Sequence, residues 1–507
     1  MTHLKQWDPE DPGFWEKQGK RIANRNLWIS VPNLFCGFAV WLYWSIITVQ
    51  MKIAGFPFDN EQLFTLSAIA GLAGATLRIP NSFLIAISGG RNVIAVTSAL
   101  LLLPSISAGL ALQNLGTPYG TFVIIAALSG IGGGAFASSM SNISFFFPKR
   151  VAGSSLGINA GLGNLGVSAM QVLLPFVMAF PLFGALGGEG IALADGSFSY
   201  AQNAGLVWVP ILIAVSLAAW FGMSNLPMHK IGSTPGAVVR ILVLTILGFC
   251  AAAGGLYLLL TMAWSMWIVL PITIVLTLAL MRFASPRAVR ESLKEQFGIF
   301  RLKHNWVMTY LYTMTFGSFI GYAAAFPLLI KVVFGELPDG TENPNAPNPY
   351  AYAWLGAFVG SLIRPVGGWL SDKFGGARVT HWDTIIMIGA ALGVAHFVIQ
   401  AGQSQTPEDY FLPFLLLFLL LFITTGIGNG STFRMIAIIF PSAQAGPVLG
   451  WTSSVAAYGA FIIPKVFGVQ VKAGTPQYAL YGFALYYTTC LLLNWWFYAR
   501  KSAEIKC

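Results

Sequence analysis

The chain has 507 residues, of which 56% are hydrophobic and 9% are charged, and its net charge is +10. The charged residues cluster between apolar runs of about 20 residues, the length that spans a hydrocarbon core, so the composition excludes an ordinary soluble protein. The positive charge follows membrane topology, because cytoplasmic loops favour lysine and arginine, and we expect no nucleic-acid partner. The 4 cysteines are scattered without CxxC spacing. We therefore expect no metal site, no disulfide framework and no cofactor.

The chain begins with a charged segment, residues 1–26, which lacks the apolar core of a cleaved signal. We expect a tail there, followed by a six-helix bundle over 27–228 with spans near 28–50, 62–87, 93–112, 120–146, 153–180 and 204–224. Residues 229–303 form a linker with two extra spans, near 239–260 and 264–282. A second six-helix bundle covers 304–500, with spans near 304–333, 350–371, 381–401, 410–438, 446–469 and 477–498, before a short tail, 501–507.

The basic residues set the expected orientation of these spans. A topology with both termini in the cytoplasm places most of the 28 lysines and arginines in cytoplasmic segments, among them Lys149 and Arg150 between the fourth and fifth spans. Positively charged loops stay on the cytoplasmic side. We therefore expect a multi-pass protein with both tails in the cytoplasm.

The two sets of six spans repeat each other. The pattern F-P-x-x-x-A-G-x-x-L-G begins at Phe147 and again at Phe440, and GATLRIP at 74–80 matches GSLIRP at 360–365. Arg78 and Arg364 therefore occupy corresponding positions. Parallel six-span repeats are the plan of the major facilitator superfamily, whose substrate site lies near midplane between the halves. We expect an all-α polytopic membrane protein with this fold and 14 spans, arranged as six, two and six.

The two arginines lie deep in apolar segments. A guanidinium at the centre of a bilayer costs from about 3 to more than 10 kcal/mol, so such residues usually serve a function. The alternative is a structural arginine that pairs with backbone carbonyls. Every Asp and Glu is expected in a tail, a loop or a span end, including Asp383 at the start of the ninth span. Because no internal carboxylate would neutralise the arginines, we expect an anion site. The planar fork of two hydrogen bonds favours a small monovalent oxyanion.

Other side chains at similar depth are candidates for the same site. Asn164 offers a donor and an acceptor, and Tyr312 offers a hydroxyl that orients an ion. Phe136 and Phe316 are expected to close the pocket above and below the ion, although aromatic residues in spans more often serve packing. Ser431 is a further substrate-binding candidate.

Glycine-rich stretches mark the fifth and tenth spans. Gly161-x-Gly163-x-x-Gly166 matches a dinucleotide fingerprint, but it lies within an apolar helix and not after a strand, which excludes a nucleotide site. Small residues favour close helix packing, and the alternatives are a close approach of backbone to substrate or sliding of the helices during transport. The candidate gating residues are Gly157, Gly161, Gly163, Gly166, Gly426, Gly428 and Gly430.

Polar residues nearer the span ends have other expected roles. Asp372 and Arg378 lie in GGWLSDKFGGAR, the place of the superfamily's loop motif, and we expect a cytoplasmic latch there. Arg434 is expected to be an interfacial anchor, with a ligand as the alternative. His396 is a packing residue or a proton relay. The chain has no GxxxxGK[ST] motif, so ATP is not the expected energy source.

Several blocks of the chain resemble the nitrate/nitrite porter family of the major facilitator superfamily. They are SLGINAGLGNLGV at 155–167, GIGNGSTFRMIAIIF at 426–440, RIPNSF at 78–83 and TFGSFIGY at 315–322. The resemblance implies a monomeric carrier in the bilayer of the bacterial inner membrane that exchanges nitrate for nitrite by alternating access. It also implies that Arg78 and Arg364 grip the anion, with Asn164, Tyr312 and the two phenylalanines around it.

Two alternatives to exchange stay open. One is a proton-coupled nitrate symporter, against which the expected lack of a carboxylate within the spans argues. The other is a non-transporting anion sensor, although the chain carries no soluble output domain. An enzyme is not expected, because the intramembrane residues supply no pair of nucleophile and base.

Overall fold

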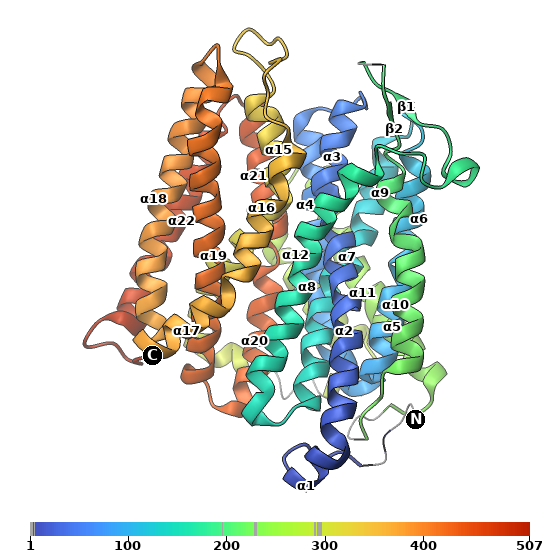
Figure 1. Cartoon of the computed structure of the whole chain (residues 1–507). Coiled ribbons are helices and arrows are strands. Elements are labelled where there is room, and N and C mark those ends of the chain that lie inside the picture. Colours follow the sequence, from blue (N-terminus) through green and yellow to red (C-terminus); the bar gives the residue numbers. More distant parts are fainter. Residues whose placement is uncertain (1–3, 5, 195, 228–230, 288–289, 292–296) are drawn as a thin grey trace.

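The computed structural model describes residues 4, 6–194, 196–227, 231–287, 290–291 and 297–507. It is a bundle of long helices that run between two faces, and α1 and the C-terminal segment lie at the same one (Figure 1). We call this the terminus face and the opposite one the distal face. Within the described residues, 12 helices are long and apolar enough to cross a membrane.

The N half, which we define as α2 to α10, follows a short entry of α1 (Pro12–Phe14) and η1 (Trp15–Gly19). Where the chain leaves the distal face, α4 begins with a capping box in which Asp59 and Gln62 bond each other's backbone. The elements are α2 (Lys20–Leu42), α3 (Trp44–Ile53), α4 (Asn60–Ser88), α5 (Gly90–Leu100), α6 (Leu102–Ala111), α7 (Tyr119–Phe146), α8 (Lys149–Val177), η2 (Gly184–Gly187), β1 (Ile191–Ala192), β2 (Phe198–Ser199), α9 (Asn203–Leu206) and α10 (Trp208–Gly222). The strands form one antiparallel hairpin at the distal face.

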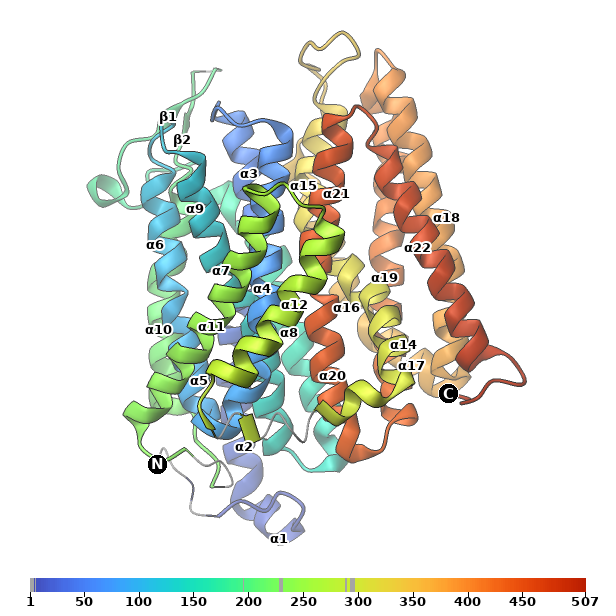
Figure 2. The same ribbon diagram turned by 180° about the vertical axis from the view of Figure 1, so that it is seen from behind.

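The linker contributes two long helices, α11 (Thr234–Leu260) and α12 (Met266–Ala284), which pack on the N half. Gly248 of α11 lies against Leu77 and Pro80 of α4, and Gly255 lies against Thr273 of α12. Figure 2 shows the pair lying across the back of α4 and α7. The predicted extra spans are therefore two apolar helices attached to the N half.

The C half, which we define as α14 to α22, follows η3 (Phe297–Arg301). Its elements are α14 (Lys303–Tyr312), η4 (Thr313–Gly317), α15 (Ser318–Phe334), α16 (Pro349–Leu362), α17 (Arg364–Phe374), α18 (Gly376–Gln403), η5 (Pro407–Tyr410), α19 (Phe411–Ile439), α20 (Ser442–Ala456), α21 (Gly459–Lys472), α22 (Gln477–Asn494) and η6 (Trp495–Ala499). The seventh predicted span is a continuous helix through α14, η4 and α15, and η4 is a π-helical segment in its middle.

The helices lie where the spans were predicted, but the count of 14 spans stays a prediction. The eighth predicted span has a turn at Ile363 between α16 and α17, of 14 and 11 residues. Neither this span nor α22 is among the 12 helices that are both long and apolar enough in the described part of the chain. The bundle boundaries at 27–228 and 304–500 also stay predictions.

Corresponding glycines end the second helix of each repeat. Gly89 between α4 and α5 has φ 77°, and Gly375 between α17 and α18 has φ 88°. Side chains other than hydrogen rarely tolerate this left-handed backbone. The chain therefore turns sharply at the terminus face in both halves, directly below the two helices that carry Arg78 and Arg364.

The glycines of α8 divide into two sets by their surroundings. Gly163 lies against Leu34 of α2, and a β-carbon at Gly166 would lie 2.9 Å from the carbonyl carbon of Phe35. A β-carbon at Gly157 or Gly161 would meet no atom within 4 Å. Only the first set is therefore required for close packing of α8 on α2.

We expect alanine substitutions at Gly161 and Gly166 to change stability in opposite directions. Gly161→Ala gains helix propensity of about 1 kcal/mol without a clash. Gly166→Ala drives a methyl group into the Phe35 backbone, and overpacking of this kind costs about 1 to 3 kcal/mol. Apparent thermal unfolding midpoints in detergent, measured side by side, check the pair. Equal shifts of both midpoints would contradict the α2–α8 contact.

Candidate functional site

Arg78 lies fully buried in α4, among aromatic rings and backbone carbonyls. Its Nε donates to the Gly133 carbonyl of α7 at 3.1 Å, and its Nη1 donates to the Ser453 carbonyl of α20 at 3.1 Å. Its Cζ lies 4.7 Å from the ring centroid of Phe136 and 5.4 Å from that of Trp41. The remaining nitrogen, Nη2, is buried without a hydrogen-bond partner in the described structure.

Arg364 starts α17, directly after the break at Ile363. Its Cζ lies 4.3 Å from the ring centroid of Phe319 and 5.8 Å from that of Phe316. Its Nε and Nη2 are both buried without a hydrogen-bond partner in the part of the chain that is described. Arg364 therefore has more unused donors than Arg78, although the two residues occupy matching places in the repeat.

Phe316 lies close to both guanidiniums. The Cζ atom of Arg78 lies 5.2 Å from its ring centroid and that of Arg364 lies 5.8 Å away. Phe316 is fully buried in the π-helical segment η4 of the seventh span. A cation over an aromatic face is stabilised by the ring quadrupole. The two arginines thus lie close together, because both contact the ring of Phe316.

Neither arginine has an acidic partner among the residues that the structure describes. The ion pairs of the described residues that involve arginine are Arg287 with Glu291 and Arg434 with Asp372. Two buried guanidiniums with three unused donor nitrogens form a site that favours an anion, because burial of a charge without a partner is costly. Their planar donors suit a small oxyanion, with Nη2 of Arg78 and both Nε and Nη2 of Arg364 unused.

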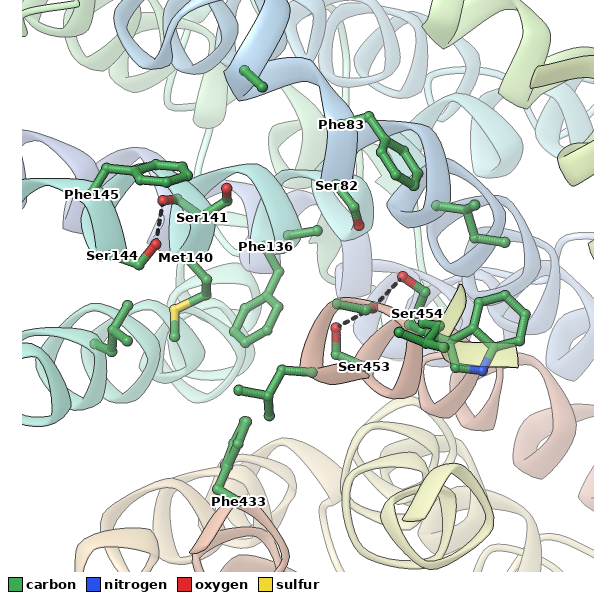
Figure 3. Close-up of a pocket in the computed structure, with 18 of the residues that line it drawn as sticks. Ser82, Phe83, Phe136, Met140, Ser141, Ser144, Phe145, Phe433, Ser453 and Ser454 are labelled. Atoms are coloured by element: carbon green, nitrogen blue, oxygen red, sulfur yellow. Dashed lines mark hydrogen bonds between the residues drawn. The ribbon is translucent and has the colours of Figure 1, made fainter. Parts of the chain in front are cut away.

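A cavity of about 470 Å³ runs from Phe136 and Ser453, which both contact Arg78, toward the terminus face, and neither arginine is among the residues that line it. It is lined by residues of both halves, and Phe136 and Phe433 point into it from opposite sides (Figure 3). Four of the serines that line it, Ser82, Ser144, Ser453 and Ser454, donate to carbonyls of their own helices, as Ser82 does to the Arg78 carbonyl at 2.9 Å and Ser454 does to the Gly450 carbonyl at 2.8 Å. Since these hydroxyls donate to backbone, they leave the strong anion donors to the arginines.

The other predicted aromatic and tyrosine residues join the same cluster. Phe136 stacks on Phe316 with centroids 6.1 Å apart, and Tyr312 stacks on Phe316 at 5.7 Å. Tyr312 also meets Phe433 of α19 edge to face at 5.2 Å. All of these rings are buried or partly buried. The structure therefore brings Phe136, Phe316 and Tyr312 to the arginines.

Asn164 and Ser431 have a less direct relation to the arginines. Asn164 is buried in α8, where its amide nitrogen donates to the Ala160 carbonyl at 2.7 Å and its Oδ1 has no partner among the described residues. Ser431 bonds Thr380 of α18 at 2.7 Å and the Gly428 carbonyl at 3.0 Å. The structure thus places Ser431 at the contact between α18 and α19. Its role in substrate binding stays a prediction.

The glycines of α19 lie at close contacts with three neighbouring elements. Gly426 lies against Ile363 and the Gly360 carbonyl, Gly428 lies against Thr315, and a β-carbon at Gly430 would lie 2.6 Å from the Arg364 carbonyl oxygen. These contacts let α19 approach the break before α17 and the π-helical segment. The glycines therefore support the geometry of the site, and their part in gating stays a prediction.

One of the two predicted latch residues at the terminus face forms an ion pair. Asp372 at the end of α17 forms an ion pair with Arg434 of α19 at 2.6 Å, and both side chains are exposed to solvent. Arg378 is exposed and forms no ion pair among the described residues. The role of Asp372 and Arg378 as a cytoplasmic latch stays a prediction. The ion pair joins Asp372 to Arg434, the residue expected as an interfacial anchor.

One expectation about the carboxylates is wrong. Asp383 was expected at the start of a span, but α18 begins at Gly376, and Asp383 lies in its third turn with 5% of its surface exposed. The reason is the turn at Gly375, which starts the helix five residues before the predicted span. The interior of the C half therefore contains a carboxyl group.

The distal face is closed by contacts between the halves. Glu61 of α4 pairs with Lys465 at 3.1 Å and Lys472 at 2.8 Å, both in α21, and Lys52 of α3 pairs with Glu336 at 2.9 Å. Nearer the site, the hydroxyls of Thr76 and Tyr458 lie 2.9 Å apart. With the cavity on the other side, these contacts describe a site that is open toward the terminus face.

Two residues of the cluster were missed in the sequence. Trp41 lies under Arg78 and donates its Nε1 to the Ala70 carbonyl at 2.7 Å, and Phe319 lies under Arg364. Phe319 follows Phe316 at a spacing of three, which places both on one helical face. This spacing could have predicted that Phe319 belongs to the cluster. Trp41 carries no comparable signal, because apolar helices contain many aromatic residues.

Comparison with curated proteins finds close relatives, whereas a scan against models of protein families finds no match. The chain is 38% identical to the nitrate/nitrite transporter NarU of Escherichia coli strain K12, over 99% of this chain and 97% of that protein. It is also 38% identical to the probable nitrate/nitrite antiporter NarK2 of Thermus thermophilus, over 100% of this chain and 98% of that protein.

Solved structures with a similar fold are distant in sequence. The proton:xylose symporter XylE of the major facilitator superfamily has a TM-score of 0.56 at 14% identity, over 94% of this chain and 96% of that one. An auto-inhibited peptide transporter of the POT family has a TM-score of 0.59 at 13% identity, over 93% and 96%. These likenesses confirm the predicted fold. The chain is a multi-pass membrane transporter and not an enzyme, and it belongs to the nitrate/nitrite porter family of the major facilitator superfamily.

Proposed function

We propose that this protein exchanges nitrate for nitrite across the bacterial inner membrane, with the anion held between Arg78 and Arg364. The observation that carries the proposal is the pair of buried guanidiniums around Phe316, which have unused donors and no acidic partner among the described residues. The names of the relatives, which are nitrate/nitrite transporters and antiporters, support the choice of anions.

The chemistry of the site agrees with these anions. Nitrate and nitrite are small, flat and singly charged, so one ion can accept hydrogen bonds from two guanidinium forks at once. The rings of Phe136 and Phe316 supply flat walls in the same cluster. A larger or doubly charged anion would require more donors than Arg78 Nη2 and the two free nitrogens of Arg364.

The structure represents one of the two states that alternating access requires. Ion pairs hold α4 to α21 at the distal face, and the cavity opens toward the terminus face. With both tails in the cytoplasm, as we propose, this is the inward-facing state. Transport then requires the distal pairs to break and the walls of the cavity to close.

Electrostatics supports strict exchange over uniport. Two unit charges about 8 Å apart repel by about 2 kcal/mol at an effective dielectric constant near 20. An empty carrier has to enclose the two repelling charges when it passes between states. A bound anion removes this repulsion. A ligand shifts such an equilibrium only through its different affinity for the two states. The loaded carrier therefore crosses more readily than the empty one.

A second candidate function is proton-coupled symport of nitrate. The sequence argued against it because no carboxylate was expected within the spans, but Asp383 lies buried in α18. This observation removes the argument. His396, the other residue considered for proton transfer, lies exposed on the outer side of α18, away from the cluster.

We expect labelled nitrate to enter proteoliposomes only when they contain nitrite or nitrate. The empty carrier returns slowly, so uptake requires an anion on the inner side as a counter-substrate. Initial rates with nitrite-loaded and anion-free vesicles measure this directly. Strong uptake into anion-free vesicles, driven by a pH gradient alone, would instead establish symport.

Lysine substitutions are expected to abolish high-affinity binding although they keep the charge. Arg78→Lys and Arg364→Lys each replace a planar fork by a point charge, and loss of a charge-assisted pair of hydrogen bonds costs about 2 kcal/mol or more. We expect nitrate affinity to fall at least tenfold in each variant. Arg282→Lys, at an exposed arginine of α12, is the matched control. Unchanged affinity in either site variant would rule out the two-arginine site.

Removal of the Glu61 carboxylate is expected to favour the outward-facing state. Glu61→Gln breaks both ion pairs between α4 and α21, each worth about 1 kcal/mol or less at a partly exposed site. The population should shift a few-fold. Spin labels at exposed Leu115 and Tyr478, one in each half, would report a longer distance. Glu291→Gln, which breaks the surface pair with Arg287, should leave that distance unchanged.

A further inference from the structure

Asp383 is the buried ionisable group that the proposed exchange leaves unused. It lies about 10 Å along α18 from the first residue of that helix, at a rise of 1.5 Å per residue, and only 5% of its surface is exposed. Its Oδ2 atom is buried and has no hydrogen-bond partner in the described residues. A carboxylate buried without a partner is costly, whereas the neutral carboxyl group is tolerated far better.

The surroundings of Oδ2 do not form the shell of a metal ion. A β-carbon at Gly428 would lie 2.9 Å from this oxygen and 2.5 Å from the methyl carbon of Thr315, so the carboxyl end faces a glycine backbone and a methyl group. No cluster of three or more His, Cys, Asp or Glu occurs in the described residues. Hard cations require several oxygen ligands, and a proton requires only the carboxyl oxygen itself.

Asp383 lies near the short segment that carries Phe316. Its Oδ2 atom and the methyl carbon of Thr315 both face Gly428, and Thr315 directly precedes Phe316, whose ring lies near both guanidiniums. Both residues belong to the π-helical segment η4, a type of distortion that is frequent at functional sites. One turn of the seventh span therefore lies between the buried carboxyl group and the two buried cations.

The other charged and titratable groups near α18 leave Asp383 without a partner. None of those that the structure describes forms an ion pair or a hydrogen bond with it. They are Arg378, His381 and His396 on α18 itself, Tyr312, Tyr322 and Lys331 on the seventh span, Arg364, Asp372 and Lys373 on α17, Glu408, Asp409 and Tyr410 on η5, Arg434 on α19, Tyr478, Tyr481, Tyr486, Tyr487 and Cys490 on α22, and Tyr498 on η6.

We propose that Asp383 is a proton-binding site whose protonation is linked to anion binding at Arg78 and Arg364, an inference that rests on the proposed function. Ionised Asp383 adds a negative charge that compensates the arginines and repels an incoming anion. The protonated residue adds none, so the anion binds this form more tightly. By linkage, a bound anion also favours the protonated form to the same extent.

The sign of the pH dependence follows from this linkage. Affinity is highest at low pH, where Asp383 is neutral, and it falls as the pH rises through the titration of Asp383 in the anion-free protein. A unit charge about 10 Å away at an effective dielectric constant near 20 changes affinity by roughly tenfold. The proton released on ionisation passes from the carboxyl group to water.

The test is nitrate binding to the purified full-length protein by calorimetry between pH 5 and pH 9. We expect the wild type to lose affinity about tenfold across this range. Asp383→Asn, a neutral side chain of the same shape, should hold the tight affinity at every pH. Asp409→Asn, at an exposed carboxylate of the same half, should keep the wild-type profile. A pH indicator in weakly buffered solution should also show proton uptake by the wild type on addition of nitrate.

Several results would overturn the proposal. One is a nitrate affinity of the wild type that does not change with pH, together with no proton uptake. Another is a nitrate affinity of Asp383→Asn that changes with pH as in the wild type. An increase in affinity with sodium at constant pH would replace the proton by a metal cation. Absence of nitrate binding at every pH would contradict the proposed function itself. The proton-uptake measurement needs no variant, so it decides the question even if Asp383→Asn does not fold.

Discussion

The arrangement of the whole site depends on two buried cations that share one aromatic ring. Arg78 and Arg364 both lie over Phe316, and no carboxylate among the described residues neutralises either of them. Aromatic faces and backbone carbonyls stabilise a guanidinium without cancelling its charge. The protein therefore holds the two charges in place while leaving them available, and an acidic partner would stabilise the fold at the expense of the anion.

Close helix packing is the condition for this arrangement, and glycine provides it. Gly133 exposes the carbonyl that holds Arg78, and Gly430 lets α19 approach the Arg364 backbone. In membranes, small residues allow helices to associate through backbone contact. The glycine stretches thus affect the site by letting the helices that carry it approach each other closely. The contrast between Gly161 and Gly166 shows that one motif combines positions that packing requires with positions that face open space.

The sequence predicted the fold and much of the cluster for identifiable reasons. Charged residues in apolar runs are rare, and the repeat aligned Arg78 with Arg364, so both arginines could be found before any coordinates. Ser431 was a further candidate, but the direction in which a helical side chain points depends on packing, and its hydroxyl meets Thr380. Asp383 was misplaced because the helix start depends on the turn at Gly375 and not on hydropathy.

The two arginines are equivalent in the repeat but not in their bonding, and this difference has a consequence for transport. Arg78 already uses two donors, one of them across the halves to the Ser453 carbonyl of α20, whereas Arg364 makes no hydrogen bond to the described residues through Nε or Nη2. In the carrier that we propose, a bound anion therefore satisfies Arg364 most. In that carrier, closure of the cavity has to move α20 relative to α4, which strains the bond from Arg78 to Ser453. An anion that accepts from Arg78 would offset that loss, so the proposed function links occupancy of the site physically to movement of the halves.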